Sequence, residues 1–180
     1  MGGAGEGGAA GWVREVRAGE AELLAGAEGV RAPSLLGLGL LGAAGGVAAA
    51  SLAQKMAPPR RCRVLLAHER VEGAASGNGV VVGYIVFERR GSGAHLCELA
   101  VREGSRRRGW GRALLAHALE LLESQDPRPL FVSLRVDPER SPGALRLYES
   151  AGFVADSRQP DYYGPGRDAL YMLRDPGDIN

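Results

Sequence analysis

The feature that most constrains the fold is a series of short β-strand patterns that recur along the chain. Segments rich in valine, isoleucine, leucine and aromatic residues, bounded by glycine, proline and polar residues, are typical of strands. They occur at residues 12–17, 63–68, 80–89, 95–101, 130–136, near 153 and at 168–173. These patterns predict a sheet of several strands at the centre of the fold.

Two amphipathic helix patterns interrupt this series. The first covers residues 112–124, where apolar residues recur at positions i, i+3, i+4 and i+7 and form one stripe: Leu115, Ala118, Leu119 and Leu122. The second covers residues 141–151 and begins with Ser141 and Pro142, a typical helix start. We expect one more helix between the first two strands. The resulting order is strand, helix, three strands, helix, strand, helix, two strands, which predicts an α/β (α+β) fold with a mixed sheet.

Charge and cysteine content exclude several classes of function. The 22 basic and 21 acidic residues give a net charge of +1, and the pI is near 7.8. Such a chain has no bulk field to hold a polyanion, so we expect no nucleic-acid partner. Cys62 and Cys97 lie far apart in the sequence, without a CxxC motif or a histidine at ligand spacing. We therefore expect neither a disulfide framework nor a metal site.

The two ends of the chain carry little apolar content. Residues 1–11 consist of small residues with no apolar period, so we expect a flexible glycine-rich tail there, and a short C-terminal tail at residues 176–180. The rest, residues 12–175, has the length of one domain. Acidic residues near the start, such as Glu6 and Glu15, argue against a secretory signal or a transit peptide. We therefore expect a cytoplasmic protein, with an organelle as the alternative.

Residues 32–54 form a stretch of 23 residues without a charge, which is long enough to span a bilayer as a helix. The stretch is richer in glycine and alanine than in leucine and isoleucine, and each glycine weakens a helix by about 1 kcal/mol relative to alanine. We therefore favour a segment of a soluble domain. A membrane anchor is the alternative.

The most informative segment is the arginine-glycine turn between the strand pattern at 95–101 and the helix pattern at 112–124. A helix N-terminus presents free N–H groups and a partial positive charge, glycines allow close approach of the backbone, and arginines add bidentate donors. The turn therefore predicts a cradle for phosphate groups, unless it is only a basic surface turn. Its residues are Arg106, Arg107, Arg108, Gly109, Trp110, Gly111 and Arg112.

This turn resembles the acetyl-CoA signature R/Q-x-x-G-x-G/A of the GCN5-related N-acetyltransferase (GNAT) family, with Arg106, Gly109 and Gly111 at the fixed positions. A second segment is similar to the family's A-x-x-L-Y-x-x-x-G-F motif and consists of Ala144, Leu147, Tyr148, Gly152 and Phe153. The resemblance implies a GNAT fold, a mixed and mostly antiparallel central sheet flanked by helices, over residues 12–175. It also implies acetyl-CoA as co-substrate, with pantetheine and the thioester carbonyl held by the backbone of Leu99, Ala100 and Val101.

A third segment, residues 159–172, resembles the tyrosine-pair hairpin of family members that acetylate protein N-termini, including the ribosomal-protein alanine type. In that subgroup the paired tyrosines hold the peptide, which implies substrate binding by Tyr162 and Tyr163 here. A turn packed on the sheet edge is the alternative interpretation.

The same resemblance implies Tyr148 as both a cofactor contact and the acid that protonates the leaving thiolate. For the general base, His95 occupies a position where relatives carry a glutamate or tyrosine, and a neutral imidazole suits the task. Glu98 is the second candidate, although its side chain has the opposite parity unless a bulge intervenes. A third position, acidic in the bacterial alanine acetyltransferase, is Arg135 here, which cannot act as a base. His68 and His117 are expected to be structural or solvated.

The sequence therefore predicts an acetyl-CoA-dependent N-acetyltransferase that acts on the α-amine of a protein or peptide, without a metal and with an auxiliary subunit left open. One alternative is a GNAT enzyme for a lysine or a small-molecule amine. Another is a catalytically silent acyl-CoA-binding module.

Overall fold

A computed structural model of the chain describes residues 11–17, 56, 62–70 and 79–175. The elements in this part of the chain follow the expected order. They are β1 (Gly11–Val16), β2 (Arg63–Glu69), β3 (Val80–Arg90), β4 (Gly93–Val101), the 3₁₀ turn η3 (Glu103–Ser105), α2 (Trp110–Glu123), β5 (Val132–Val136), α3 (Pro142–Ser150), β6 (Val154–Gln159) and β7 (Ala169–Arg174).

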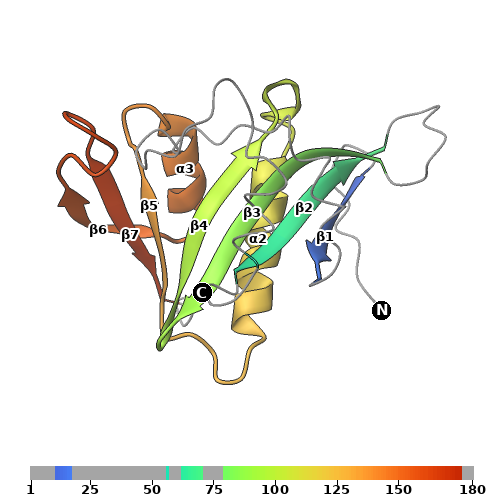
Figure 1. Ribbon diagram of the computed structural model, residues 1–180, viewed down its shortest axis with the longest axis horizontal. Coiled ribbons are helices and arrows are strands. Elements are labelled where there is room, and N and C mark those ends of the chain that lie inside the picture. The colour runs from blue at the N-terminus through green and yellow to red at the C-terminus, as the bar shows by residue number, and fades with distance from the viewer. Residues whose placement is uncertain (1–10, 18–55, 57–61, 71–78, 176–180) are drawn as a thin grey trace.

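The seven strands form one sheet in the order β1-β2-β3-β4-β5-β7-β6 (Figure 1). Among these described strands, β4 and β5 pair in parallel and every other neighbouring pair is antiparallel. The chain crosses from β4 to β5 through α2, because parallel neighbours need a long connection. The prediction of a mixed, mostly antiparallel sheet is confirmed.

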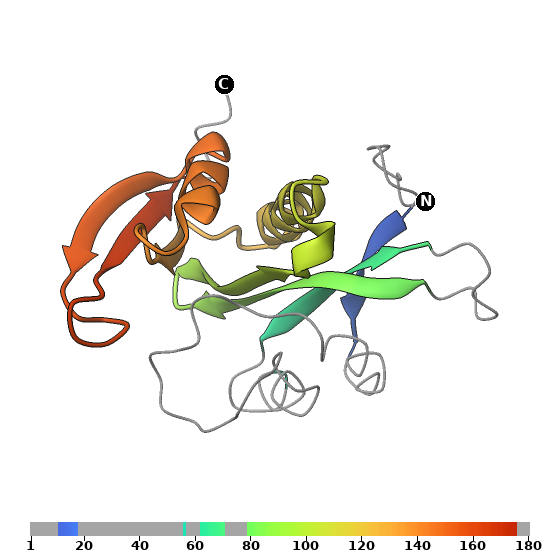
Figure 2. The ribbon, with the colours of Figure 1, turned by 90° about the horizontal axis from the view of Figure 1, so that it is seen from above.

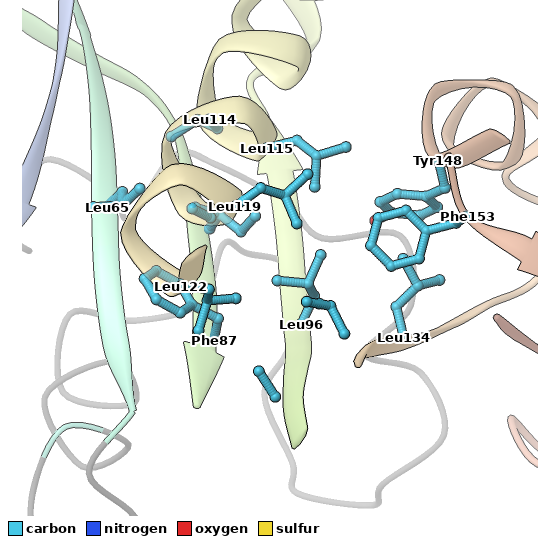
Figure 3. Packing of buried hydrophobic residues seen from close by; sticks show 14 of the residues in the cluster. Leu65, Phe87, Leu96, Leu114, Leu115, Leu119, Leu122, Leu134, Tyr148 and Phe153 are labelled. Atoms are coloured by element: carbon cyan, nitrogen blue, oxygen red, sulfur yellow. The ribbon is translucent and has the colours of Figure 1, made fainter. Parts of the chain in front are cut away.

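Helix α2 packs on one face of the sheet through the predicted leucine stripe. Its buried residues are Trp110, Leu114, Leu115, Ala118, Leu119 and Leu122. They contact Leu65, Phe87 and Leu96 of the sheet in the main hydrophobic cluster, whose side chains are shown in Figure 3. The helix begins two residues earlier than its apolar period suggests, because Trp110 is itself part of the core.

Helix α3 lies on the same face of the sheet as α2 (Figure 2). Pro142 is its first residue and Ser141 its N-cap, as predicted, but the serine hydroxyl makes no capping hydrogen bond. The backbone carbonyl of Ser141 instead accepts from the N–H groups of Ala144 and Leu145, each at 3.0 Å. From α3, Tyr148 extends the main cluster towards Phe153 (Figure 3).

The structure corrects two boundaries. Gly11, which was predicted to belong to the tail, is the first residue of β1 and pairs with Glu69. A Cβ at this position would overlap the His68 carbonyl and the Trp110 ring, so glycine serves packing here. Leu130 and Phe131 precede β5 rather than forming part of it, and Leu130 is 69% exposed.

Three predictions lie outside the described residues: the tail over residues 1–10, the helix between the first two strands together with the uncharged stretch 32–54, and the tail at 176–180. In the part of the chain that the structure describes, no helix combines the length and the apolar character needed to cross a bilayer.

Candidate functional site

The site begins where two parallel strands separate. β4 and β5 pair only at Ala94–Val132, His95–Ser133 and Leu96–Leu134. Beyond these pairs the strands diverge, as Figure 1 shows. The edge of β4 from Cys97 to Val101 therefore faces an opening rather than a neighbouring strand, and its backbone groups on that edge can bind a ligand.

A cavity of about 530 Å³ lies at this opening, a typical volume for a small-molecule site. The end of β4, the arginine-glycine turn and the start of α3 line it. Eight of the predicted cofactor residues contribute to the lining: Leu99, Ala100, Val101, Arg106, Arg107, Gly109, Gly111 and Arg112. Seven further residues line the cavity and were not predicted as cofactor contacts: Ser105, Arg140, Ser141, Pro142, Gly143, Ala144 and Leu147. Two of these, Ala144 and Leu147, lie in the second motif, whose spacing points to this helix.

The backbone of the arginine-glycine turn is shaped for anion binding. Gly109, the N-cap of α2, has φ +89°, and Arg107 has φ 63°, so the turn contains two left-handed residues. The first intrahelical bond runs from the Ala113 N–H to the Gly109 carbonyl at 2.9 Å. The N–H groups of the first helical turn precede this bond and point out of the helix, where the dipole favours an anion.

The two glycines of the turn serve different purposes. A Cβ on Gly109 would meet no atom within 4 Å, so its left-handed φ is what requires glycine. A Cβ on Gly111 would lie 3.3 Å from Leu147 Cδ2, so glycine lets α2 approach α3 closely. Arg106 is fixed by its Nε, which donates to the Val101 carbonyl at 3.0 Å.

Two of the predicted cradle residues do not line the cavity. The Trp110 side chain is buried in the main hydrophobic cluster, which leaves only its backbone at the turn. The Arg108 side chain forms an ion pair with Glu69 on β2. An apolar ring and an already paired guanidinium could not be distinguished from cradle residues by their sequence positions alone.

A β-bulge at Cys97 decides the orientation of the base candidates. Val86 pairs with Glu98 and Phe87 pairs with Leu96, so Cys97 is the extra residue of β4. The bulge changes the alternation of side chains, and His95 and Glu98 both point to the face of the sheet opposite α2. We call this side of β3, β4 and β5 the far face.

His95 is buried against β5. Its Nδ1 lies 2.9 Å from Ser133 Oγ, and that hydroxyl donates to the Ala94 carbonyl at 3.1 Å. Because the single hydroxyl proton is used in this way, the bond to His95 requires a proton on Nδ1. Nε2 then carries the lone pair. Burial and, after it, the positive charges of Arg90 and Arg135 together lower the pKa of His95 to about 4, so the ring is neutral at neutral pH.

Glu98 is also buried, and its carboxylate accepts a hydrogen bond from the Tyr84 hydroxyl at 3.4 Å. Burial raises the pKa of Tyr84 well above the ordinary value for tyrosine, which keeps that hydroxyl a donor. Both base candidates therefore lie on the far face, in contact with polar partners.

Tyr148 lies on α3, buried against Phe153 with ring centroids 5.9 Å apart and an interplanar angle of 67°. Burial raises the pKa of its phenol, and the neighbouring Tyr163 raises it further. The hydroxyl therefore stays protonated at neutral pH, but Tyr148, which the sequence predicts as a cofactor contact, is not among the residues that line the cavity.

The predicted tyrosine pair lies in the loop between β6 and β7, where the two rings pack edge to face with centroids 4.9 Å apart. Tyr162 is 44% exposed, whereas Tyr163 is buried. Burial raises the pKa of Tyr163 to about 12, as does the nearby Tyr162. Arg167 stacks on Tyr163 and forms a buried ion pair with Asp137 at 2.9 Å, which fixes the loop to the end of β5. Only one tyrosine of the pair thus offers its ring to a ligand.

The fold brings the two cysteines together on the far face. The Sγ atoms of Cys62 and Cys97 and a carboxylate oxygen of Glu88 lie within 4.8 Å of one another. Cys62 donates its thiol proton to Glu88 at 3.2 Å. Burial raises the pKa of Cys62 to about 12, as does the hydrogen bond to Glu88, so the thiol keeps its proton at neutral pH. With the Cys62 thiol protonated, Cys62 and Glu88 are joined by a hydrogen bond; as thiolates and a carboxylate, the three groups could hold a metal ion. The distance of 35 residues between the cysteines did not predict this contact.

The other two histidines, which the sequence predicts to be structural or solvated, contact neighbouring residues of the fold. His68 is buried and stacks on Trp12 with centroids 5.2 Å apart. His117 on α2 is partly buried, with Nδ1 3.2 Å from the Ala113 carbonyl oxygen.

Known proteins resemble this chain in sequence. The [ribosomal protein bS18]-alanine N-acetyltransferase of Escherichia coli is 31% identical over 86 residues, which are 48% of this chain and 56% of that protein. The chain thus spans about half the length of the curated relatives it matches.

Solved structures resemble it over nearly the whole chain. Ard1 from Thermoplasma volcanium superposes with a TM-score of 0.66 at 26% identity, covering 92% of this chain and 97% of that one. The E. coli ribosomal-protein-S18-alanine N-acetyltransferase gives a TM-score of 0.65 at 18% identity, covering 94% and 96%, which shows a shared fold. The model of the acetyltransferase (GNAT) family matches residues 51–153, more than half of the sequence, and so takes in β4, the turn, α2 and α3. The chain belongs to the acetyltransferase (GNAT) family.

Proposed function

We propose that this protein transfers an acetyl group from acetyl-CoA to the α-amine of a protein or peptide N-terminus. The observation that carries the proposal is the separation of β4 and β5. It opens a cavity towards the arginine-glycine turn on one side and leaves His95 and the exposed Tyr162 near the far face on the other.

The cavity fits the chemistry of acetyl-CoA. The first-turn N–H groups of α2, together with Arg106, Arg107 and Arg112, suit the pyrophosphate. The open edge of β4 from Leu99 to Val101 offers backbone groups for the pantetheine amides and donors for the thioester carbonyl. The side chains of Ala144 and Leu147 supply an apolar wall.

The protein's own residues can move the two protons of the reaction. When bound, acetyl-CoA supplies a thioester carbonyl to which an amine adds, so that a C–N bond forms as the C–S bond breaks. His95 Nε2, with its lone pair set by the bond to Ser133, accepts a proton from the amine. The Tyr148 hydroxyl, held in the protonated form, donates a proton to the departing sulfur. Glu98, on the same face, is the second candidate for the base.

An α-amine suits such a site better than a lysine. At neutral pH an α-amine with a pKa of about 7.7 to 8.0 needs only about 1 kcal/mol to lose its proton, whereas a lysine at about 10.4 needs about 4.6 kcal/mol. His95 is a weak base because of its low pKa, and a weak base is adequate only for the easier substrate. The relatives named for alanine N-acetylation support the same substrate class.

Mass spectrometry of acetylated peptides tests the proposal. Each peptide carries one free α-amine and one internal lysine, and is incubated with the protein and acetyl-CoA. We expect acetylation of the α-amine alone. Modification of the lysine would instead indicate a lysine acetyltransferase. Acetyl-CoA binding without any product would favour a small-molecule acceptor, a missing subunit or a silent binding module.

Tyr162→Ala tests the peptide site within the same assay. Because Tyr162 is the exposed member of the pair, we expect its loss to raise KM for peptides about 10-fold and to leave acetyl-CoA binding intact. Phe131→Ala, which removes a comparably exposed aromatic residue just before β5, is the matched control. An equal effect of both variants would contradict a peptide-binding role.

A further inference from the structure

We propose that Arg135 forms a binding subsite for a carboxylate, so that the enzyme prefers N-termini with an acidic side chain at the first or second residue. This inference rests on the proposed function and specifies its substrate class.

Arg135 lies on the far face beside the point where β4 and β5 diverge. Val132, Leu134 and Val136 of β5 are buried in the main hydrophobic cluster, so Ser133 and Arg135 point the other way. Ser133 is the hydrogen-bond partner of His95, and Arg135 is the next residue on that face. An acceptor whose amine is near His95 therefore passes Arg135.

The guanidinium of Arg135 is held in place by three neighbours. Its carbon lies 5.0 Å from the ring centroid of Tyr162 and 5.0 Å from that of Tyr171. Its Nε donates to Gln159 Oε1 at 2.7 Å. Within the described ranges, no protein acceptor takes up the two terminal nitrogens. A guanidinium that is oriented in advance binds a carboxylate with two parallel bonds and loses little side-chain entropy.

The neighbouring arginines differ from Arg135 in one respect, because each of them has a carboxylate partner. The pairs are Arg90–Glu88, Arg167–Asp137 and Arg158–Asp168. Among residues 11–17, 62–70 and 79–175, Arg135 has no such partner. It stacks on the rings of Tyr162 and Tyr171 instead, and a bound anion can balance its charge.

The positive charge of Arg135 affects the pKa of His95, the proposed base. After burial, the positive charges of Arg90 and Arg135 are the next causes that lower the pKa of His95. A substrate carboxylate bound to Arg135 would offset this charge and make His95 a stronger base. The subsite would therefore favour acidic acceptors both in binding and in proton transfer.

Matched peptide pairs test the inference. The pairs differ only in Asp against Asn, or Glu against Gln, at the first or second residue, and kcat/KM for α-amine acetylation is measured for each. At one of the two positions we expect the acidic peptide to be favoured about 10-fold, as for a hydrogen bond to a charged group. The preference should shrink as salt is raised, because the charges are partly exposed.

Variants assign the preference to Arg135. Arg135→Gln is expected to bring the acidic-to-neutral ratio close to one, and Arg135→Lys to keep part of it, because lysine retains the charge without the planar fork. Arg146→Gln removes an exposed arginine of α3 and is the matched control, with the ratio unchanged. If Arg135 had only a structural role, its loss would lower kcat/KM equally for both peptides of a pair and leave the acidic-to-neutral ratio of kcat/KM unchanged.

Each contrary result is distinct. Equal acetylation of acidic and neutral peptides by the unmodified enzyme would overturn the inference and leave the proposed function standing. A preference that survives Arg135→Gln would show that another cation makes the subsite. The absence of α-amine product from every peptide would overturn the proposed function, and the inference with it.

Discussion

The buried, neutral state of His95 makes the stability of the fold depend on pH in a way that one substitution can isolate. The pKa of His95 is about 4 in the folded protein, against about 6.5 for histidine in an unfolded chain. Between these two values the unfolded state binds the proton and the folded state does not. Stability is therefore lost as the pH falls through this window, and it is unaffected by His95 above it.

The size of the effect follows from the two pKa values. The loss attributable to His95 is close to zero at about pH 7.5, about 1.4 kcal/mol at about pH 5.5, and about 2.5 kcal/mol at about pH 4.5. The substitution His95→Asn removes the titrating ring and keeps a side chain able to bond to Ser133. The change in packing alters the free energy of unfolding by the same amount at every pH. It therefore cancels when the pH-dependent loss of stability is compared between the variant and the unmodified protein.

Denaturant unfolding of the unmodified protein and of His95→Asn at these pH values measures the effect. We expect the unmodified protein to lose about 2.5 kcal/mol more than the variant between about pH 7.5 and about pH 4.5. His117→Asn, which removes a partly buried histidine from α2, is the matched control. A pH-independent difference between the unmodified protein and His95→Asn would refute the neutral, buried state of His95.

Two further predictions concern proton donation and the turn. Tyr148→Phe removes the hydroxyl that we propose as the proton donor to the leaving group, so we expect kcat to fall about 100-fold. Acetyl-CoA affinity, measured by calorimetry, should change little, and an unchanged kcat would refute the role. Gly109→Ala forces a side chain into φ +89° and should cost about 1 kcal/mol, or about 2 to 4 °C in Tm. Gly104→Ala is its control, with open space and no left-handed φ; equal Tm changes in the two variants would contradict the argument.

The order of elements could be predicted because it depends on local patterns. The leucine stripe of α2 and the proline at the start of α3 encode helices whose apolar faces the structure confirms. The position of the arginine-glycine turn between β4 and α2 could be predicted as well, since its residues are contiguous in the sequence.

Features that depend on tertiary contacts could not be predicted in the same way. The bulge at Cys97 is a property of the pairing between β3 and β4, and without it the parity of Glu98 relative to His95 cannot be known. The burial of Tyr163 depends on Arg167, whose partner Asp137 is 30 residues away. The exposed Tyr162 differs from it only in its place in the folded loop.

The short contact between β4 and β5 divides the sheet mechanically as well as chemically. Three residue pairs join the block of β1 to β4 to the block of β5 to β7, while each block is held internally by longer antiparallel ladders. A ligand that binds both the β4 edge and the start of α3 contacts both blocks, and so restrains their relative motion at the β4–β5 contact. Saturation with acetyl-CoA should therefore slow amide hydrogen exchange at the β4–β5 contact more than within either block. The bound co-substrate would then stabilise the junction of the two blocks.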